Sequence, residues 1–341
     1  MKAVCDDKIP FIRPALDELM DEVAYLPGNQ ITNEDVHDAE VLIVRTRTRC
    51  NRQLLEGSRV RFIATATIGF DHIDTDYLRE AGIQWMNCPG CNATSVAQYV
   101  RSSLILWQRH TGCDLSRLTA GVVGVGHVGR EVVRVLESFG CRILLCDPPR
   151  AEKEGGEQFV TLGQIAREAN IVTLHTPLTR GGQWPTWHMV DGRFFHALGH
   201  RPLIINTSRG EVVDNGALET AMDDGRIRQA IIDTWENEPD IRRSLLNKVF
   251  IGTPHIAGYS ADGKANATRM VLQALCHYLG RPCTFRIVPP PLPDVSALPT
   301  PCYERALALY NPMRDSDLLK GRPEDFETLR GNYPLRREKA E

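Results

Sequence analysis

The chain has 341 residues, of which 42% are hydrophobic and 24% charged, and its formal net charge at pH 7 is -3. This length suits two domains better than one, and the composition is that of an ordinary globular protein. The small net charge excludes a general attraction to nucleic acid or to anionic membranes, and no apolar run approaches the roughly 20 residues that span a bilayer. The N-terminal residues lack an apolar signal core, so we expect a cytoplasmic protein with reduced cysteines.

The first hundred residues alternate short apolar runs with helix-like stretches. Such alternation is typical of βαβ units and therefore of a parallel sheet. A long helix with one buried face is predicted over 93–109. The apolar runs predict five strands, at 3–4, 23–26, 41–44, 60–64 and 83–86.

A second alternating series follows, and several of its apolar runs are continuous. Continuous runs are expected for strands that helices cover on both faces. The predicted strands are 121–124, 143–146, 171–174, 203–206, 230–233 and 249–251. Six such strands with short connections fit a doubly wound, dinucleotide-binding sheet, so the predicted fold class is α/β with two doubly wound parallel-sheet domains.

A helix over 261–279 is predicted to cross back to the first domain, and the composition of the chain changes after this helix. Beyond it, ten of the 21 prolines lie in residues 281–341. The run of prolines at 289–291 is a poor helix or strand and a good stiff connector. Short helices are predicted over 303–310 and 324–329.

A glycine-rich turn follows the first strand of the second series. It consists of Gly124, Val125, Gly126, His127, Val128 and Gly129. In a dinucleotide-binding domain the first glycine allows a tight turn, the second lets the backbone approach a pyrophosphate, and the third lets helix and strand pack closely. The pyrophosphate then lies on free amides at a helix N-terminus. By itself the motif is weak, because an ordinary glycine-rich turn can carry it.

An acidic residue at the end of the next strand strengthens this interpretation. Asp147 lies 18 residues after Gly129, close to the spacing of about 20 residues expected for a carboxylate that binds the adenosine ribose. A carboxylate accepts hydrogen bonds from a 2′-hydroxyl and repels a 2′-phosphate. We therefore expect NAD rather than NADP as the cofactor, a preference that the nearby Arg150 weakens.

Three polar segments follow later strands of the second series, where open α/β sheets bind their ligands. Arg209 follows the fourth strand, and a guanidinium there can hold a carboxylate through two parallel hydrogen bonds. Glu238 lies in an acidic loop after the fifth strand, and His255 follows the sixth. Taken singly, each is explained as well by a surface arginine, a solvated acidic loop or a structural histidine.

Together the three residues meet the needs of one reaction. Oxidation of a secondary alcohol removes the hydroxyl proton while a hydride leaves the same carbon, and a histidine suits the proton step. A carboxylate on the other ring nitrogen fixes the tautomer and stabilises the imidazolium. An arginine holds the substrate carboxylate and polarises the developing carbonyl.

These motifs resemble the D-isomer-specific 2-hydroxyacid dehydrogenases from the N-terminus to about Gly280. The resemblance rests on the glycine turn, on the arginine-glycine pair after a strand, on the glutamate-proline loop and on the late histidine. It implies that Arg209, Glu238 and His255 are the catalytic set, with His255 as the acid and base. Hydride transfer to NAD requires no metal, and we expect none.

The resemblance also implies a domain organisation and an assembly. Residues 1–93, completed by 259–280, correspond to a flavodoxin-like substrate domain, and residues 94–258 to a Rossmann NAD-binding domain. Residues 281–341 correspond to a C-terminal dimerisation domain, here rich in proline and shorter than expected. A homodimer in the cytoplasm is therefore expected, without nucleic-acid or membrane partners.

Four segments are similar to one branch of this family, which oxidises 4-phosphoerythronate in the synthesis of pyridoxal phosphate. They are 64–74, 87–93, 145–150 and 255–260. By this resemblance the substrate contacts fall on Thr46, Thr67 and Tyr259. The NAD contacts fall on Asp147, Thr176, Thr207, Asp233 and Gly258.

A substrate with a carboxylate and a phosphate requires cationic groups besides Arg209. Arg45 and Arg47 follow the predicted strand at 41–44 and are candidates for the phosphate, and an extended backbone would place them on one side together with Arg49. Solvated charges at a strand end are an equally good explanation.

Two alternative functions stay open at this point. The first is a sibling enzyme, such as a phosphoglycerate dehydrogenase or a hydroxypyruvate or glyoxylate reductase, which would share the fold and the catalytic set. The second is a non-catalytic NAD-sensing protein of the corepressor type, against which the complete set of Arg209, Glu238 and His255 argues.

Overall fold

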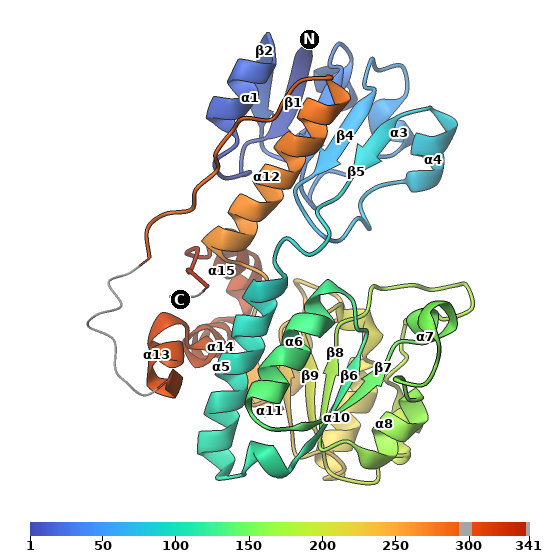
Figure 1. Cartoon of the computed structure of the whole chain (residues 1–341), viewed down its shortest axis with the longest axis vertical. Coiled ribbons are helices and arrows are strands. Elements are labelled where there is room, and N and C mark those ends of the chain that lie inside the picture. Colours follow the sequence, from blue (N-terminus) through green and yellow to red (C-terminus); the bar gives the residue numbers. More distant parts are fainter. Residues whose placement is uncertain (293–301, 339–341) are drawn as a thin grey trace. The chain divides into compact units, whose positions relative to one another are not determined.

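Each half of the predicted alternation forms its own parallel sheet in the computed structural model, which describes residues 1–292 and 302–338 (Figure 1). Met1–Asn92 and Ser260–Pro291 make up what we call unit 1. Ala93–Tyr259 and the described residues from Leu292 onward make up unit 2. None of the described helices is both long enough and apolar enough to cross a membrane.

The sheet of unit 1 has the strand order β2-β1-β3-β4-β5. Its strands are β1 (Lys2–Asp6), β2 (Glu22–Leu26), β3 (Val41–Val44), β4 (Phe62–Thr65) and β5 (Gln84–Met86). All neighbouring pairs are parallel. This is the order of flavodoxin-like sheets, so the predicted fold class is confirmed for this unit.

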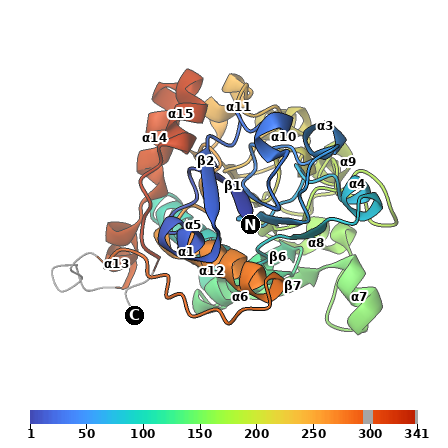
Figure 2. The ribbon, with the colours of Figure 1, turned by 90° about the horizontal axis from the view of Figure 1, so that it is seen from above.

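Helices cover both faces of this sheet. They are α1 (Arg13–Leu19), α2 (Asn33–Val36), α3 (Arg52–Leu55), α4 (Thr75–Glu80) and α12 (Ala261–Tyr278). Consecutive residues of β3 point to opposite faces: Val41 and Ile43 pack with α1 and α12, whereas Leu42 and Val44 pack with residues of α2, α3 and α4. Figure 2 shows α1 and α12 side by side on one of these faces.

The sheet of unit 2 has the strand order β11-β10-β9-β8-β6-β7. Its strands are β6 (Thr119–Val123), β7 (Arg142–Cys146), β8 (Ile171–Leu174), β9 (Leu203–Asn206), β10 (Gln229–Ile232) and β11 (Ile251–Gly252). All pairs are again parallel. The strand order reverses at β6, where the chain runs first to β7 and then to β8 on the other side, and ligands of open α/β sheets bind beside such a point.

Two apolar layers enclose this second sheet. Its helices are α5 (Ala93–Thr111), α6 (His127–Ser138), α7 (Pro148–Glu154), α8 (Leu162–Glu168), α9 (Gly192–His196), α10 (Asn215–Asp223) and α11 (Arg243–Lys248), with the short 3-10 helices Leu115–Arg117 and Gly210–Val212. Ile205 and Ile231 face the layer that contains α5 and α6. Ile204 and Ile232 face the layer that contains α8 to α11. This two-sided burial explains the continuous apolar runs in the sequence.

The end of the chain is helical and belongs to unit 2. It contains α13 (Cys302–Leu309), α14 (Pro312–Gly321), the 3-10 helix Pro323–Asp325 and α15 (Phe326–Gly331). Sequence analysis missed α14, whose buried Leu319 joins the core layer of α8 to α11. Residues 281–292 form neither helix nor strand, and the rest of the proline-rich connector, 293–301, lies outside the described residues.

Candidate active site

The glycine turn connects β6 to α6 in the way that its spacing predicts. Gly124 has a φ of +84°, which favours glycine, and a Cβ there would lie 2.7 Å from the carbonyl oxygen of His175. A Cβ on Gly129 would collide with the carbonyl oxygen of Gly124. Both positions are therefore closed to larger residues by the packing of the turn itself.

The middle glycine differs, because nothing in the protein crowds it. A Cβ on Gly126 would meet no atom within 4 Å, and the residue is the N-cap of α6, with His127 and Val128 in the first turn of the helix. A glycine that the protein does not itself require leaves space for a ligand to approach the backbone. The free amides of the α6 N-terminus suit a pyrophosphate, so the residues present fit a dinucleotide.

Asp147 stands at the end of β7 and fixes the same turn. Its carboxylate accepts a hydrogen bond of 2.8 Å from the backbone nitrogen of Val125 and one of 3.2 Å from that of Arg150, at the start of α7. Arg150 is not a free cation beside it, since its guanidinium makes two hydrogen bonds of 2.6 and 2.8 Å with the Glu154 carboxylate. Because Glu154 neutralises the Arg150 guanidinium, less positive charge is available to bind the 2′-phosphate of NADP.

Two of the predicted NAD contacts lie after β8 and β9. Thr176 follows His175, and Thr207 follows Asn206. The Thr207 hydroxyl lies 3.3 Å from Nδ1 of His175, whose Nε2 lies 2.9 Å from the Thr173 hydroxyl. Desolvation lowers the pKa of His175 from 6.5 to about 3, so this ring is neutral at pH 7 and serves to tie neighbouring loops together.

Arg209 is held at the end of β9 by the backbone around it. Its carbonyl oxygen accepts a hydrogen bond from the Asn206 side-chain amide at 2.9 Å, and its Nη1 donates to the carbonyl oxygen of Ser208 at 2.8 Å. A Cβ on Gly210 would collide with the carbonyl group of Trp235. The glycine after the arginine therefore allows this loop to pack directly on the loop after β10.

Asp233 fastens the loop after β11 to the end of β10. Its buried carboxylate accepts hydrogen bonds from the Thr253 hydroxyl (2.6 Å) and from the backbone nitrogens of Ile256 (2.8 Å) and Ala257 (2.9 Å). Desolvation raises the pKa of Asp233, and the charge of His255 and these hydrogen bonds oppose the rise. Gly258, another predicted NAD contact, follows directly in the loop that Asp233 holds.

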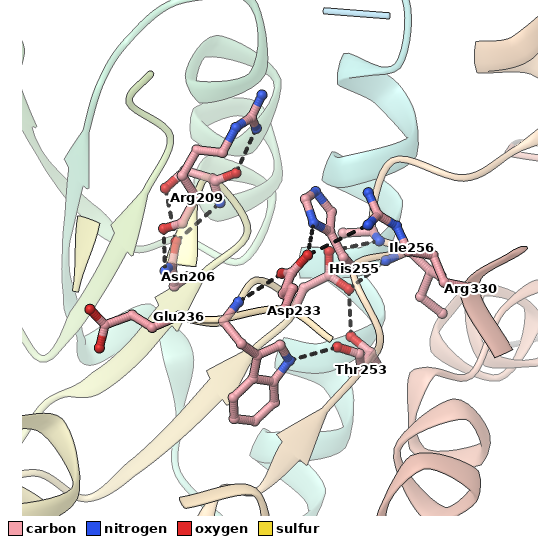
Figure 3. A network of polar contacts seen from close by, with 12 residues as sticks. Asn206, Arg209, Asp233, Glu236, Thr253, His255, Ile256 and Arg330 are labelled. Atoms are coloured by element: carbon pink, nitrogen blue, oxygen red, sulfur yellow. Dashed lines mark hydrogen bonds and ion pairs between the residues drawn. The ribbon is translucent and has the colours of Figure 1, made fainter. Parts of the chain in front are cut away.

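Glu238 and His255 form the central pair of the site, and Figure 3 labels His255 within this network of polar contacts. Nδ1 of His255 lies 2.8 Å from Oε2 of Glu238, and Oε1 accepts a hydrogen bond of 2.9 Å from the backbone nitrogen of Trp235. Burial by itself would raise the pKa of Glu238, but the charges of His255 and Arg330 and these hydrogen bonds lower it. An ionised carboxylate accepts only, so Nδ1 carries the proton and Nε2 is left to act as a base.

Both loops of this pair contain a residue in the left-handed region. Asn237 has a φ of +60° and His255 a φ of +56°. Residues other than glycine rarely adopt this conformation, and where they do it is the surrounding packing that imposes it. Asp233 supplies that packing for His255, because it binds the two backbone nitrogens that follow the histidine.

The predicted substrate contacts of unit 1 follow β3 and β4. Residues 45–48 turn instead of staying extended, with the Thr48 nitrogen donating to the Arg45 carbonyl at 3.3 Å. Arg45, Arg47 and Arg49 therefore do not line one side of an extended backbone, contrary to what the sequence led us to expect. Arg45 is half-buried and pairs with the buried Asp6 at 3.3 Å, whereas Thr46, Arg47 and Arg49 are exposed.

Thr67 takes part in a chain of polar contacts after β4. Its hydroxyl lies 2.7 Å from that of Thr65 and donates to the Gly69 carbonyl at 2.9 Å. The Thr65 hydroxyl lies 2.9 Å from Nε2 of His72. The conformation of this loop is thus set by side chains within unit 1.

Two arginines near the end of the chain belong to the site without having been predicted from the sequence. Nη1 of Arg330 lies 3.6 Å from Oε2 of Glu238. Arg336 donates to three carbonyl oxygens of the loop that follows His255, those of Ile256 (3.1 Å), Ala257 (2.6 Å) and Tyr259 (2.8 Å). No spacing signal marks these residues, because their partners lie more than 70 positions earlier in the chain.

Comparison with known proteins agrees with this geometry. Residues 92–257 match the family model described as D-isomer specific 2-hydroxyacid dehydrogenase, NAD binding domain. An erythronate-4-phosphate dehydrogenase of Bacteroides thetaiotaomicron is 55% identical over 339 residues, which cover 99% of this chain and 97% of the relative. A protein of the same name from Marinobacter nauticus is 45% identical and covers 99% of this chain and 93% of its own length.

Solved structures share the fold at lower sequence identity. D-lactate dehydrogenase from Aquifex aeolicus, in complex with NAD and lactic acid, matches with a TM-score of 0.69 at 24% identity, over 82% of this chain and 96% of that one. NAD-bound 3-phosphoglycerate dehydrogenase of Entamoeba histolytica matches with a TM-score of 0.70 at 24% identity, over 84% and 98% of the two chains.

Proposed function

Because this chain belongs to the erythronate-4-phosphate dehydrogenases, within the family of D-isomer specific 2-hydroxyacid dehydrogenases, we propose that it oxidises 4-phospho-D-erythronate with NAD. The product is 3-hydroxy-2-oxo-4-phosphooxybutanoate, and the reaction serves the synthesis of pyridoxal 5′-phosphate. The observation that carries the chemistry is the 2.8 Å contact between His255 and Glu238. The substrate is supported by the name shared by relatives that match along the full chain.

In the proposed mechanism His255 is the base. Its Nδ1 proton is engaged by Glu238, so Nε2 takes the proton of the substrate C2 hydroxyl. The C2–H bond breaks with its electron pair, which leaves as hydride, and the C2–O bond becomes a carbonyl. Glu238 stabilises the imidazolium that forms, and Arg209 holds the substrate carboxylate through paired hydrogen bonds. In the reverse reaction, His255 returns the proton.

NAD supplies the hydride acceptor when it is bound. We propose that the glycine turn at 124–129 holds its pyrophosphate and that Asp147 holds the adenosine ribose. The remaining contacts are proposed at Thr176, Thr207, Asp233 and Gly258. Comparable kcat/KM values with NADP and NAD would overturn the role of Asp147.

The phosphate of the substrate is assigned to unit 1 in this proposal. Arg45 is the better candidate of the two arginines, because Asp6 orients its guanidinium and the loop holds its backbone. Arg47 is the second candidate, and Thr46 and Thr67 bind further substrate oxygens. Tyr259 of unit 2 completes the proposed substrate contacts.

A substrate panel tests the proposed function. Purified enzyme is assayed for NAD-linked oxidation of 4-phosphoerythronate, 3-phosphoglycerate, D-lactate and D-glycerate, with a 2-oxo acid present to reoxidise bound NADH. The highest kcat/KM is expected for 4-phosphoerythronate. A higher value for 3-phosphoglycerate would identify a sibling enzyme, and NAD binding without turnover of any acid would identify a sensor.

We also propose that the enzyme is a cytoplasmic homodimer formed through residues 281–341. Leu318 on α14 is 46% exposed, so an apolar side chain of this segment is available for contact with a second copy of the chain. Free thiols such as Cys5 and Cys50 are compatible with a reducing compartment. Light scattering of the full chain should give twice the 38.2 kDa mass of one chain, and a Leu318→Asp variant should move it toward the monomer.

A further inference from the structure

The C-terminal helix α15 places a cation against the catalytic carboxylate. Arg330 lies in this helix, and its side chain is only 18% exposed. Its Nη1 is 3.6 Å from Oε2 of Glu238, the same oxygen that accepts from Nδ1 of His255 at 2.8 Å. One carboxylate oxygen is therefore shared by a permanent cation and by a ring that becomes cationic during the reaction (Figure 3).

We infer that Arg330 is a positioning residue that sets the proton affinity of His255 through the carboxylate they share. The inference rests on the proposed function, in which His255 is the base. Glu238 favours the protonated ring, and a second cation on the same oxygen reduces that preference. Arg330 thus keeps the histidine deprotonated, and ready to accept the substrate proton, at lower pH than Glu238 alone would allow.

The side chains that face His255 and Arg330 determine which other charges act on these two groups. His255 faces Glu238 and, in the loop after β10, Asp233. Arg330 faces Glu238, the Tyr259 hydroxyl and Glu327 of its own helix. The Asp233 carboxylate already accepts hydrogen bonds from three donors of the protein. Of these groups, Arg330 is the cation that contacts the same oxygen of Glu238 as Nδ1 of His255.

A second arginine of the same segment holds the chain end that carries Arg330 against the loop after His255. Arg336 donates to the carbonyl oxygens of Ile256, Ala257 and Tyr259, and its guanidinium lies 3.9 Å from the ring centre of Tyr310. The residues that follow His255 are thereby bound to the chain end that carries Arg330. These contacts hold the segment of Arg330 beside the loop of His255, and Nη1 of Arg330 lies 3.6 Å from Oε2 of Glu238.

The pH dependence of kcat/KM for hydroxy acid oxidation tests the inference. In Arg330→Met, the limb that reports deprotonation of the base should move to higher pH by about 0.5–1 unit, because an opposing charge at this range is removed. Activity at pH 7 should fall severalfold and recover at higher pH. Arg330→Lys, which keeps the charge, should return the midpoint pH most of the way to that of the parent enzyme.

Matched controls separate this effect from a structural one. Arg322→Met removes an arginine of the same segment whose partner is the exposed Asp325, and its pH profile should equal that of the parent enzyme. A lower kcat in Arg330→Met with an unmoved midpoint would overturn the inference, and so would a midpoint that Lys does not restore. If Arg330→Met fails to fold, Arg330→Gln, which removes the charge but keeps a polar side chain, gives the same comparison with the parent enzyme and with Arg330→Lys.

A measurement without turnover distinguishes failure of the inference from failure of the proposed function. The ring of His255, identified by its loss in His255→Gln, is titrated by NMR in the parent enzyme and in Arg330→Met. An upward shift in the titration midpoint supports the inference even if no tested acid is oxidised. An unchanged midpoint overturns it, whatever the substrate panel shows.

Discussion

The two parallel sheets end in loops of different character. In unit 2, the loops after β9, β10 and β11 are bound to one another: Gly210 packs on Trp235, Asp233 binds the backbone after His255, and Glu238 binds the His255 ring. In unit 1, the loop after β3 meets the end of β1 through the pair of Arg45 and Asp6, and it meets the loop after β2 through the hydrogen bond from Thr48 to the Gly28 carbonyl.

The difference separates two tasks. Groups that move a proton must be held within tenths of an ångström, and cross-bound loops with buried carboxylates achieve this. Groups that recognise charge tolerate more freedom, and the loop after β3 leaves Thr46 and Arg47 exposed. Substitutions in the loops of unit 2 should therefore lower kcat, whereas substitutions in those of unit 1 should raise KM.

Loss of His255 is expected to have the largest effect. His255→Gln removes the base and should lower kcat by about 10³-fold, within the range typical of general base catalysis, while the binding constant for NAD stays within twofold. Steady-state kinetics and calorimetric titration with NAD measure the two quantities. Loss of NAD binding would instead show that His255 has a structural role, and the proposed difference between the loops of the two units would then fail.

Loss of the Glu238 charge should cost less and should also move the pH profile. Glu238 has a lowered pKa and is ionised at neutral pH, where it stabilises the imidazolium. Glu238→Gln removes that stabilisation, so kcat should fall by about 100-fold and the limb of kcat/KM that reports His255 should move to lower pH.

The neighbouring Glu236 provides the control for this prediction. It lies in the same loop but contacts Nε2 of His188 at 2.5 Å and the backbone nitrogen of Asn215 at 2.8 Å. Glu236→Gln should leave the pH limb where it is. A profile that moves equally in both variants would show that the carboxylate acts through the fold of the loop and not through its charge.

Loss of Arg45 should affect binding alone. A charge-assisted hydrogen bond to a phosphate contributes enough that Arg45→Met should raise KM for the phosphorylated substrate roughly ten- to 100-fold at unchanged kcat. Arg49→Met, an exposed arginine of the same segment, serves as the control and should leave KM unchanged. If neither Arg45→Met nor Arg47→Met raises KM, the assignment of phosphate recognition to unit 1 fails.

The smallest effect concerns stability, at His175 of unit 2. The pKa of this ring is about 3 in the folded protein against an ordinary value of 6.5, so the unfolded chain binds the additional proton below pH 6.5. Stability is therefore lost as the pH falls, by about 1.6 kcal/mol between pH 6.5 and pH 5. His175→Gln should flatten that part of the curve in urea unfolding, and an equally steep curve would exclude His175 as its source.

The amino-acid sequence by itself determines most of the fold. All eleven strands of the described residues overlap a predicted run, and even the two-residue β11 overlaps the run at 249–251, because a strand buried on both faces must be apolar at every position. The glycine turn and its acid are equally local. Gly124 and Gly129 are required by backbone geometry that neighbouring residues create, and a spacing rule captures this.

Only the tertiary structure decided the electrostatics of the site. The sequence predicted that Glu238 and His255 act together, but each alone was as well explained by a solvated loop or a structural histidine. Their contact, and the approach of Arg330 to the same oxygen, depend on loops and a helix brought together by burial of residues such as Leu319 and Phe326. Charge interactions at these distances depend on three-dimensional position, which residue type and spacing do not encode.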